Sequence, residues 1–254
     1  ELKARRSGGT RNNCSIVAGY RRGMAPHKVA VERAEFRWPV ILAVVISLTM
    51  YATLPSDFPA VFRVAVVVIG VALLVPLIVV NPMRLRTQTR WSRAFSIALT
   101  ALLAAANLAA LTELIVLMVT AKSNQAGALL AAAAQVWVTH VIAFALIYWE
   151  IDRGGPVTRT LAPRQTLPHA DIRFPQDEDA DAVREVAEQS SVRTDWTANY
   201  VDYLYFSAAN TMAFSPPDAI PLTPRAKLLV GLQALGAYIL LVLAIARAVS
   251  LLGS

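Results

Sequence analysis

Three polar side chains interrupt two long apolar segments of this sequence, at Asn107, Glu113 and His140. Polar groups in such segments either hydrogen-bond between helices or carry protons. At a rise of about 1.5 Å per residue, Asn107 and His140 are expected at similar depth on antiparallel neighbouring helices, with Glu113 about two turns away. Two interpretations follow: hydrogen bonding between helices, or a proton relay through Glu113 and His140.

A second group of candidate residues lies in the stretch NTMAFSPPDAIPLT, residues 210–223. The hydroxyl oxygens of Thr211 and Ser215 and the carboxylate of Asp218 are groups that line ion pathways. The same groups can instead stabilise a proline-rich hairpin. In that case the Asp218 side chain caps the following turn and the hydroxyls bond the hairpin backbone.

The other reactive residue types are scarce and scattered. Cys14 is the only cysteine, and the three histidines, His27, His140 and His169, lie far apart with no metal-ligand spacing. We find no nucleophile–base pair and no cofactor motif. The sequence therefore predicts neither an enzyme nor a metal or cofactor site. The net charge of +7 comes without an aromatic-plus-basic pattern, so no nucleic-acid partner is expected.

The composition explains where these residues must be held. The chain is 56% hydrophobic and only 16% charged, whereas a soluble domain carries about a quarter charged residues. A shorter run, VDYLYFSAANTMAF, has the length of a re-entrant helix, and Tyr148-Trp149 is expected at a membrane interface. We predict an all-α integral membrane protein with a re-entrant hairpin and five transmembrane helices, at 38–54, 61–80, 94–119, 126–150 and 226–252.

The distribution of Lys and Arg predicts the orientation. Residues 1–37 carry nine and the loop 81–93 carries four, whereas the alternate loops carry one each, Arg63 and Lys122. Positively charged loops stay in the cytoplasm. We therefore expect a basic cytoplasmic N-terminal tail (1–37), a cytoplasmic hairpin side and an external C-terminus. Met24, which follows a basic stretch, is a candidate initiator of the native chain.

The polar segment 151–200 precedes the hairpin. Counting Glu150, it holds six Arg and ten acidic residues, a density typical of a solvated surface connector with a short helix or a disordered loop. We expect Glu150 or Asp152 to pair with an arginine near the hairpin, such as Arg225.

The sequence YFSAANTMAFSPPDAIPLTPRAKLL resembles the pore-loop module of two-helix potassium channels. Tyr205-Phe206-Ser207 matches the pore helix of that family. The stretch after its filter is matched by Asp218, Pro221, Thr223 and Pro224. The filter itself falls on Ala213, Phe214, Ser215, Pro216, Pro217 and Asp218.

The resemblance implies a division of the chain. A three-helix membrane region (38–119) would precede a pore-module-like region (120–254). The latter would comprise an outer helix (126–150), the polar loop 151–200, a re-entrant helix and loop (201–223) and an inner helix (226–252). By analogy Gln233 and Tyr238 would line the inner helix, and four copies would surround one pore.

The match fails at the filter. Its glycines adopt backbone angles closed to other residues, but Ser215 and Pro217 occupy those positions. Proline fixes φ near −65° and removes an N–H. Selective potassium conduction is therefore not expected. The predicted orientation is also inverted relative to potassium channels, as in ionotropic glutamate receptors.

The motifs WEIDRGGP, FPQ and AFSPPD, in this order, resemble a family of bacterial multi-pass membrane proteins, which lends no activity. We expect a channel-like protein of the bacterial cell (inner) membrane, with a non-potassium constriction formed by the AFSPPD loop. Its partners would be the lipid bilayer and copies of itself. The alternative is a non-conducting scaffold that keeps the pore-module fold and binds another protein.

Overall fold

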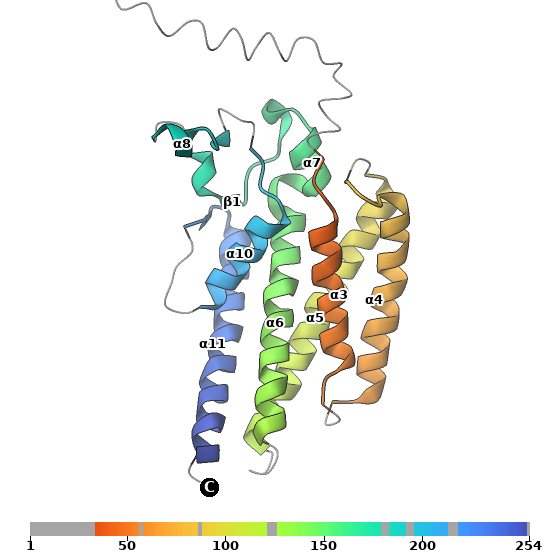
Figure 1. Ribbon diagram of the computed structural model, residues 1–254, viewed down its shortest axis with the longest axis vertical. Coiled ribbons are helices and arrows are strands. Elements are labelled where there is room, and N and C mark those ends of the chain that lie inside the picture. Colours follow the sequence, from red (N-terminus) through yellow and green to blue (C-terminus); the bar gives the residue numbers. More distant parts are fainter. Residues whose placement is uncertain are drawn as a thin grey trace, which may run out of the picture.

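The computed structural model describes residues 34–55, 58–85, 88–120, 126–178, 183–191, 196–212 and 218–252. Five long helices run side by side in one bundle (Figure 1): α3 (Trp38–Ala52), α4 (Ala60–Val80), α5 (Arg90–Thr120), α6 (Ala126–Ile151) and α11 (Pro224–Leu252). The last four are long and apolar enough to cross a membrane, whereas α3 has 15 residues. The prediction of a helical membrane protein is thus confirmed for four helices.

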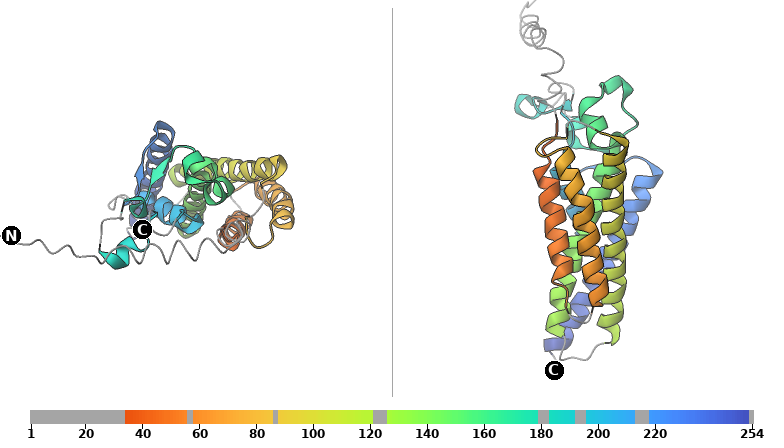
Figure 2. Two further views of the ribbon diagram at one scale, coloured as in Figure 1. Left: turned by 90° about the horizontal axis from the view of Figure 1, so that it is seen from above. Right: turned by 90° about the vertical axis from the view of Figure 1, so that its right-hand side faces the viewer.

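Helix α6 is the centre of the bundle. It packs against α3, α5, α10 and α11, while α4 packs on α3 and α5. The views in Figure 2 place α11 on one side of α6 and the α3–α5 group on the other. Alanines are buried where these helices meet, including Ala110, Ala132 and Ala145. Small side chains let helices approach closely where no water drives them together.

A cap of short elements covers the end of the bundle where α6 stops and α11 starts (Figure 1). It contains α7 (Pro156–Leu161), the strands β1 (Ile172–Arg173) and β2 (Ile220–Pro221), α8 (Arg184–Ala187) and the 3-10 turns Asp152–Gly154, Arg164–Thr166 and Pro175–Asp177. The two strands pair antiparallel, with Ile172 opposite Pro221.

The cap corrects the expected solvated connector. Asp171, Ile172 and Phe174, in and beside β1, are buried, so this part of the 151–200 segment is packed structure. The predicted short helix is present as α8, and its Arg184 and Val186 are exposed.

Helix α10 (Tyr200–Thr211) descends from the cap along α6. A capping box begins it: Asn199 Oδ1 accepts from the Val201 N–H at 2.9 Å, and Asp202 Oδ2 from the Asn199 N–H at 2.8 Å. The next described element after α10 is β2, which pairs with β1 in the cap, so α10 begins and β2 lies at the same end of the bundle (Figure 1).

Candidate functional site

The predicted constriction lies mostly outside the described residues, because Ala213, Phe214, Ser215, Pro216 and Pro217 fall there. Its two flanks are described. The Thr211 hydroxyl is buried and donates to the Ala208 carbonyl oxygen of its own helix at 2.7 Å. Asp218 is exposed at the start of the return segment. The Thr211 hydroxyl thus bonds the hairpin backbone, whereas the Asp218 carboxylate is open to solvent.

The two inner-helix candidates lie on different faces of α11. Gln233 is fully buried, and its Nε2 donates to the carbonyl oxygen and to Oγ of Ser207 at 2.9 and 2.6 Å. Its Oε1 accepts from the Tyr148 hydroxyl at 2.8 Å. Tyr238 is 56% exposed, about 140° around the helix from Gln233. Gln233 therefore fastens α11 to α6 and α10, while Tyr238 faces outward.

The outward face of α11 is almost wholly apolar. The large hydrophobic side chains exposed along it are Leu228, Leu232, Leu235, Tyr238, Leu241, Val242, Ile245 and Val249. Such a face suits lipid or the apolar surface of another helix. If copies of the chain met around α11, they would present these side chains to one another or to a central passage.

Two of the three intramembrane candidates come together. His140 Nδ1 lies 2.7 Å from Asn107 Oδ1, and both residues are buried. Asn107 Nδ2 also donates to the Val136 carbonyl oxygen at 3.2 Å. Glu113 is partly exposed and makes no hydrogen bond to this network among the described residues. The observed contacts match the predicted hydrogen bonding between helices rather than a relay through Glu113.

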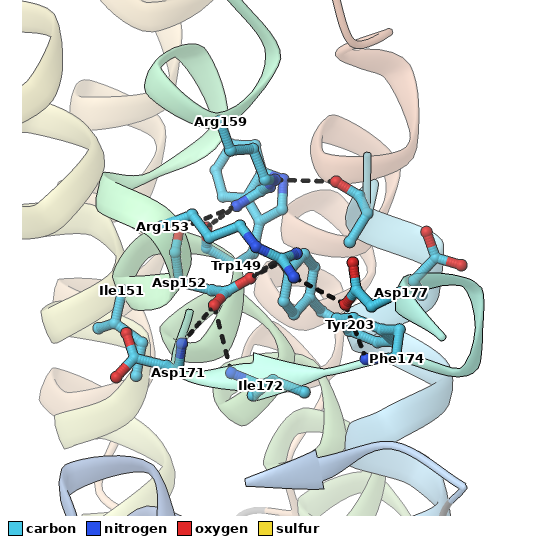
Figure 3. Close-up of polar contacts among 12 residues, drawn as sticks. Trp149, Ile151, Asp152, Arg153, Arg159, Asp171, Ile172, Phe174, Asp177 and Tyr203 are labelled. Carbon is cyan, nitrogen blue, oxygen red and sulfur yellow. Dashed lines mark hydrogen bonds and ion pairs between the residues drawn. The ribbon is translucent and has the colours of Figure 1, made fainter. Parts of the chain in front are cut away.

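A denser polar cluster, which contains none of the predicted site residues, sits where the cap meets α6 (Figure 3). The fully buried Asp152 carboxylate holds two elements at once. Its Oδ1 accepts from the N–H groups of Asp171 and Ile172 at 2.7 and 3.3 Å, and its Oδ2 from the Tyr203 hydroxyl at 2.5 Å. Asp152 therefore joins the end of α6 to β1 and to α10.

Arg225 has a partner other than the expected ones. Its Nη2 and Nε lie 2.5 and 2.7 Å from Oδ2 and Oδ1 of Asp171. Glu150 instead accepts from the Ser96 hydroxyl, and Asp152 is used as described above. The predicted pairing of Glu150 or Asp152 with Arg225 is wrong, because β1–β2 pairing brings Asp171 closer.

Arg159 crosses the same region and is buried (Figure 3). Its Nε donates to the Ala198 carbonyl oxygen and its Nη1 to that of Trp149, both at 2.8 Å. The guanidinium carbon lies 4.7 Å from the centre of the Tyr203 ring, a cation–π contact. Arg159 therefore links the residues before α10, α10 itself and α6.

Glu35 completes this cluster from the segment before α3. Its Oε1 accepts from the Tyr200 N–H at 2.6 Å and from Trp149 Nε1 at 3.0 Å, while Oε2 lies 3.4 Å from Arg159 Nη2. Burial raises the pKa of the Glu35 carboxyl, and the charge of Arg159 opposes that effect. Glu35 thus holds the first residue of α10.

The aromatic residues at this end of the bundle differ in exposure. Tyr148 and Trp149, predicted at the membrane interface, are buried and donate hydrogen bonds to Gln233 and Glu35. The exposed tryptophans are Trp38 and Trp91, at 63% and 77%, which lie at the starts of α3 and α5. These two side chains have the exposure that interfacial anchors need.

A cavity of about 50 Å³ lies beside Glu150 between α3, α4, α5 and α6. Arg37, Arg93 and Ser96 are among its polar lining. Ligand pockets for small molecules typically measure about 300–1,000 Å³, so this space suits ordered water. Within the described part of the chain, no three His, Cys, Asp or Glu side chains are grouped to hold a metal ion.

Comparison of the chain with family models, with curated proteins and with solved structures finds no match.

Proposed function

We propose that the protein is a channel-like membrane protein. In this proposal, copies of the chain assemble so that the hairpin between α10 and β2 forms a non-potassium constriction. Helix α6 acts as the outer helix and α11 as the inner helix, in a bacterial cell membrane with the cap on the cytoplasmic side.

One observation carries the proposal, namely how far α10 descends along α6. Tyr200 stacks edge-on against Trp149 with ring centres 6.1 Å apart, and the Ser207 hydroxyl donates to the Val141 carbonyl oxygen at 2.7 Å. Eight residues of α6 separate these contacts, about 12 Å at 1.5 Å per residue. Val141 lies near the middle of the apolar span Gly127–Gly154. A hairpin that enters and leaves at one end and reaches this depth is what a pore loop requires.

The depth of the hairpin also favours an oligomer. Irregular backbone at membrane depth is tolerated only where protein or water covers it. Val201 and Tyr205 on α10, and Met212 directly after it, are exposed in the single chain. Neighbouring copies around the hairpin would cover this face and enclose a central passage.

Charge supports a cation rather than an anion as the permeant species. The C-terminal half of α10 reaches the depth of Val141 on α6, and a helix C-terminus carries partial negative charge. The exposed Asp218 carboxylate follows on the return segment. The apolar face of α11 would form a hydrophobic gate below, of the kind that closes by dewetting.

The second candidate function is a non-conducting scaffold that binds another protein. It is favoured by Gln233, whose side-chain hydrogen bonds are all made within the chain. It is also favoured by the outward face of α11, where the exposed large hydrophobic side chains carry a single polar group, the Tyr238 hydroxyl.

Ion flux from liposomes containing purified protein, measured for several cations and anions, tests the proposal. Asp218→Asn should change the cation preference, whereas Glu188→Gln, which removes another exposed negative charge, in the cap, should not. The oligomeric mass in mild detergent is measured in parallel. A monomer would exclude a central pore, and a folded oligomer silent to every ion would favour the scaffold.

A further inference from the structure

His140 lies between two oxygen atoms on two different helices. Its Nδ1 is 2.7 Å from Asn107 Oδ1 on α5, and its Nε2 is 3.0 Å from the Gln233 carbonyl oxygen on α11. A neutral imidazole has one N–H and one bare nitrogen. Because a carbonyl oxygen only accepts, a neutral ring can complete only one of these bonds and must set a lone pair against the other oxygen.

The orientation of the Asn107 amide decides whether its oxygen really faces His140. Asn107 Nδ2 lies 3.2 Å from the Val136 carbonyl oxygen and 3.1 Å from Thr139 Oγ1. The Thr139 hydroxyl gives its own proton to the Val136 carbonyl at 3.0 Å, so it is an acceptor toward Asn107. Turning the amide over would place its oxygen against the Val136 carbonyl. The Asn107 oxygen therefore faces the ring.

Two uncharged neighbours, Phe144 and Gly236, lie beside the ring. The Phe144 ring centre lies 4.8 Å from that of His140, inclined by 57°, and aromatic rings attract cations. Gly236 on α11 leaves room, since a Cβ there would come within 3.2 Å of His140 Cε1.

No charged side chain of the described residues contacts the ring. Two tyrosines are the titratable groups that interact with its hydrogen-bonding partners. Tyr51 on α3 interacts with Asn107 and Thr139, and Tyr148 on α6 is reached through Gln233. Helix α10 contributes the neutral Ser207. Among the described residues, no carboxylate is hydrogen-bonded to the ring, so any charge there comes from a proton that His140 itself binds.

We propose that His140 is a proton-binding site in the membrane interior, and that the arrangement seen here is its proton-bound form. With two ring protons, the imidazolium donates to Asn107 and to Gln233 and ties α5, α6 and α11 together. Loss of one proton breaks one of these ties. His140 can bind this proton whether or not the protein conducts ions. If the protein is a channel, the same site controls how α11 sits against α6.

Nitrogen NMR of the histidine ring tests the proposal directly. The chain has three histidines, so His27→Gln and His169→Gln leave His140 as the single signal in full-length protein labelled with ¹⁵N-histidine. The expected result is a ring with two protonated nitrogens at about pH 5 and one at about pH 8. A ring that stays neutral at every pH at which the protein remains folded would overturn the proposal.

Two glycines on α11 provide a matched pair of variants. Gly236→Ala pushes a methyl group toward His140, whereas a Cβ at Gly231 meets nothing within 4 Å. At a pH where the wild type is half protonated, Gly236→Ala should lower the doubly protonated fraction several-fold, and Gly231→Ala should leave it unchanged. Equal fractions in the two variants would contradict a role for the α11 contact. Neither readout depends on flux, so it stays distinct from the channel test.

Discussion

The carboxylate of Asp171 accepts two hydrogen bonds from the guanidinium of Arg225, with Nη2 2.5 Å from Oδ2 and Nε 2.7 Å from Oδ1. The two side chains differ in exposure: Asp171 is fully buried, whereas the Arg225 side chain is 62% exposed. The pair joins the cap to the first turn of α11. Because the carboxylate is buried and the guanidinium is largely exposed, loss of the ion pair would cost the carboxylate more free energy than it would cost the guanidinium.

Removing the arginine should therefore destabilise the protein measurably. Arg225→Ala leaves the buried Asp171 carboxylate with the Thr223 hydroxyl as its remaining side-chain donor. We expect a loss of about 1–2 kcal/mol, because solvent already screens part of the ion pair. The midpoint of thermal unfolding in detergent measures it. Lys227→Ala, an exposed residue on the same turn of α11, serves as the control and should change the midpoint little.

The bond between Tyr203 and Asp152 should contribute more than an exposed hydroxyl. Tyr203→Phe removes the 2.5 Å hydrogen bond to a buried carboxylate, which should cost about 1.5–3 kcal/mol. Tyr205→Phe, on the exposed face of the same helix, should be neutral. Denaturant unfolding of both variants decides the matter, and equal stability of the two would show that the buried bond adds nothing.

Gly155 should resist substitution because of its backbone. Its φ is +96°, and a Cβ would meet the Glu150 carbonyl oxygen at 3.3 Å. Gly155→Ala should cost about 1–3 kcal/mol. Gly127→Ala makes the same change in α6, where a Cβ meets nothing within 4 Å. Alanine favours helix, so this variant should be neutral or up to about 1 kcal/mol more stable. Thermal unfolding compares them.

Stability should depend on pH through Glu35. Burial raises the pKa of its carboxyl above the usual 4.5, so the folded chain holds this proton more tightly than the unfolded chain. The contribution is fully present below the unfolded value and is lost as pH rises through the raised folded value. Unfolding midpoints measured across that window should fall more steeply with pH in the wild type than in Glu35→Gln. Parallel curves would contradict the assignment.

The long apolar runs sufficed to predict the helices. Four of the five have the length and composition of a span, whereas α3 has only 15 residues. The largest displacement of a helix start is four residues, from 94 to Arg90 in α5. Asn107 and His140 were also predictable as a pair, because depth along antiparallel helices follows from the rise per residue. Hydrophobicity and helix geometry are local properties, which explains why sequence reasoning succeeded there.

The polar cluster was not predictable in the same way. Asp171 meets Arg225 only because two-residue strands pair across the 46 positions that separate Arg173 from Ile220. Glu35 meets Tyr200 across 165 positions. One signal was available for Glu35, an acid set directly before the first apolar run. The high charge density of the 151–200 segment suggested solvation. Asp152 and Asp171 are instead buried, with Asp152 bonded by backbone N–H groups and Asp171 by Arg225.

The docking site of α10 also has an order in time. Glu35, Trp149, Asp152, Arg159 and Phe174 all precede α10 in the chain, and each contacts its residues directly. During synthesis these partners leave the ribosome first. The partners that hold α10 are therefore synthesised before α10 itself, and α11 is synthesised after it.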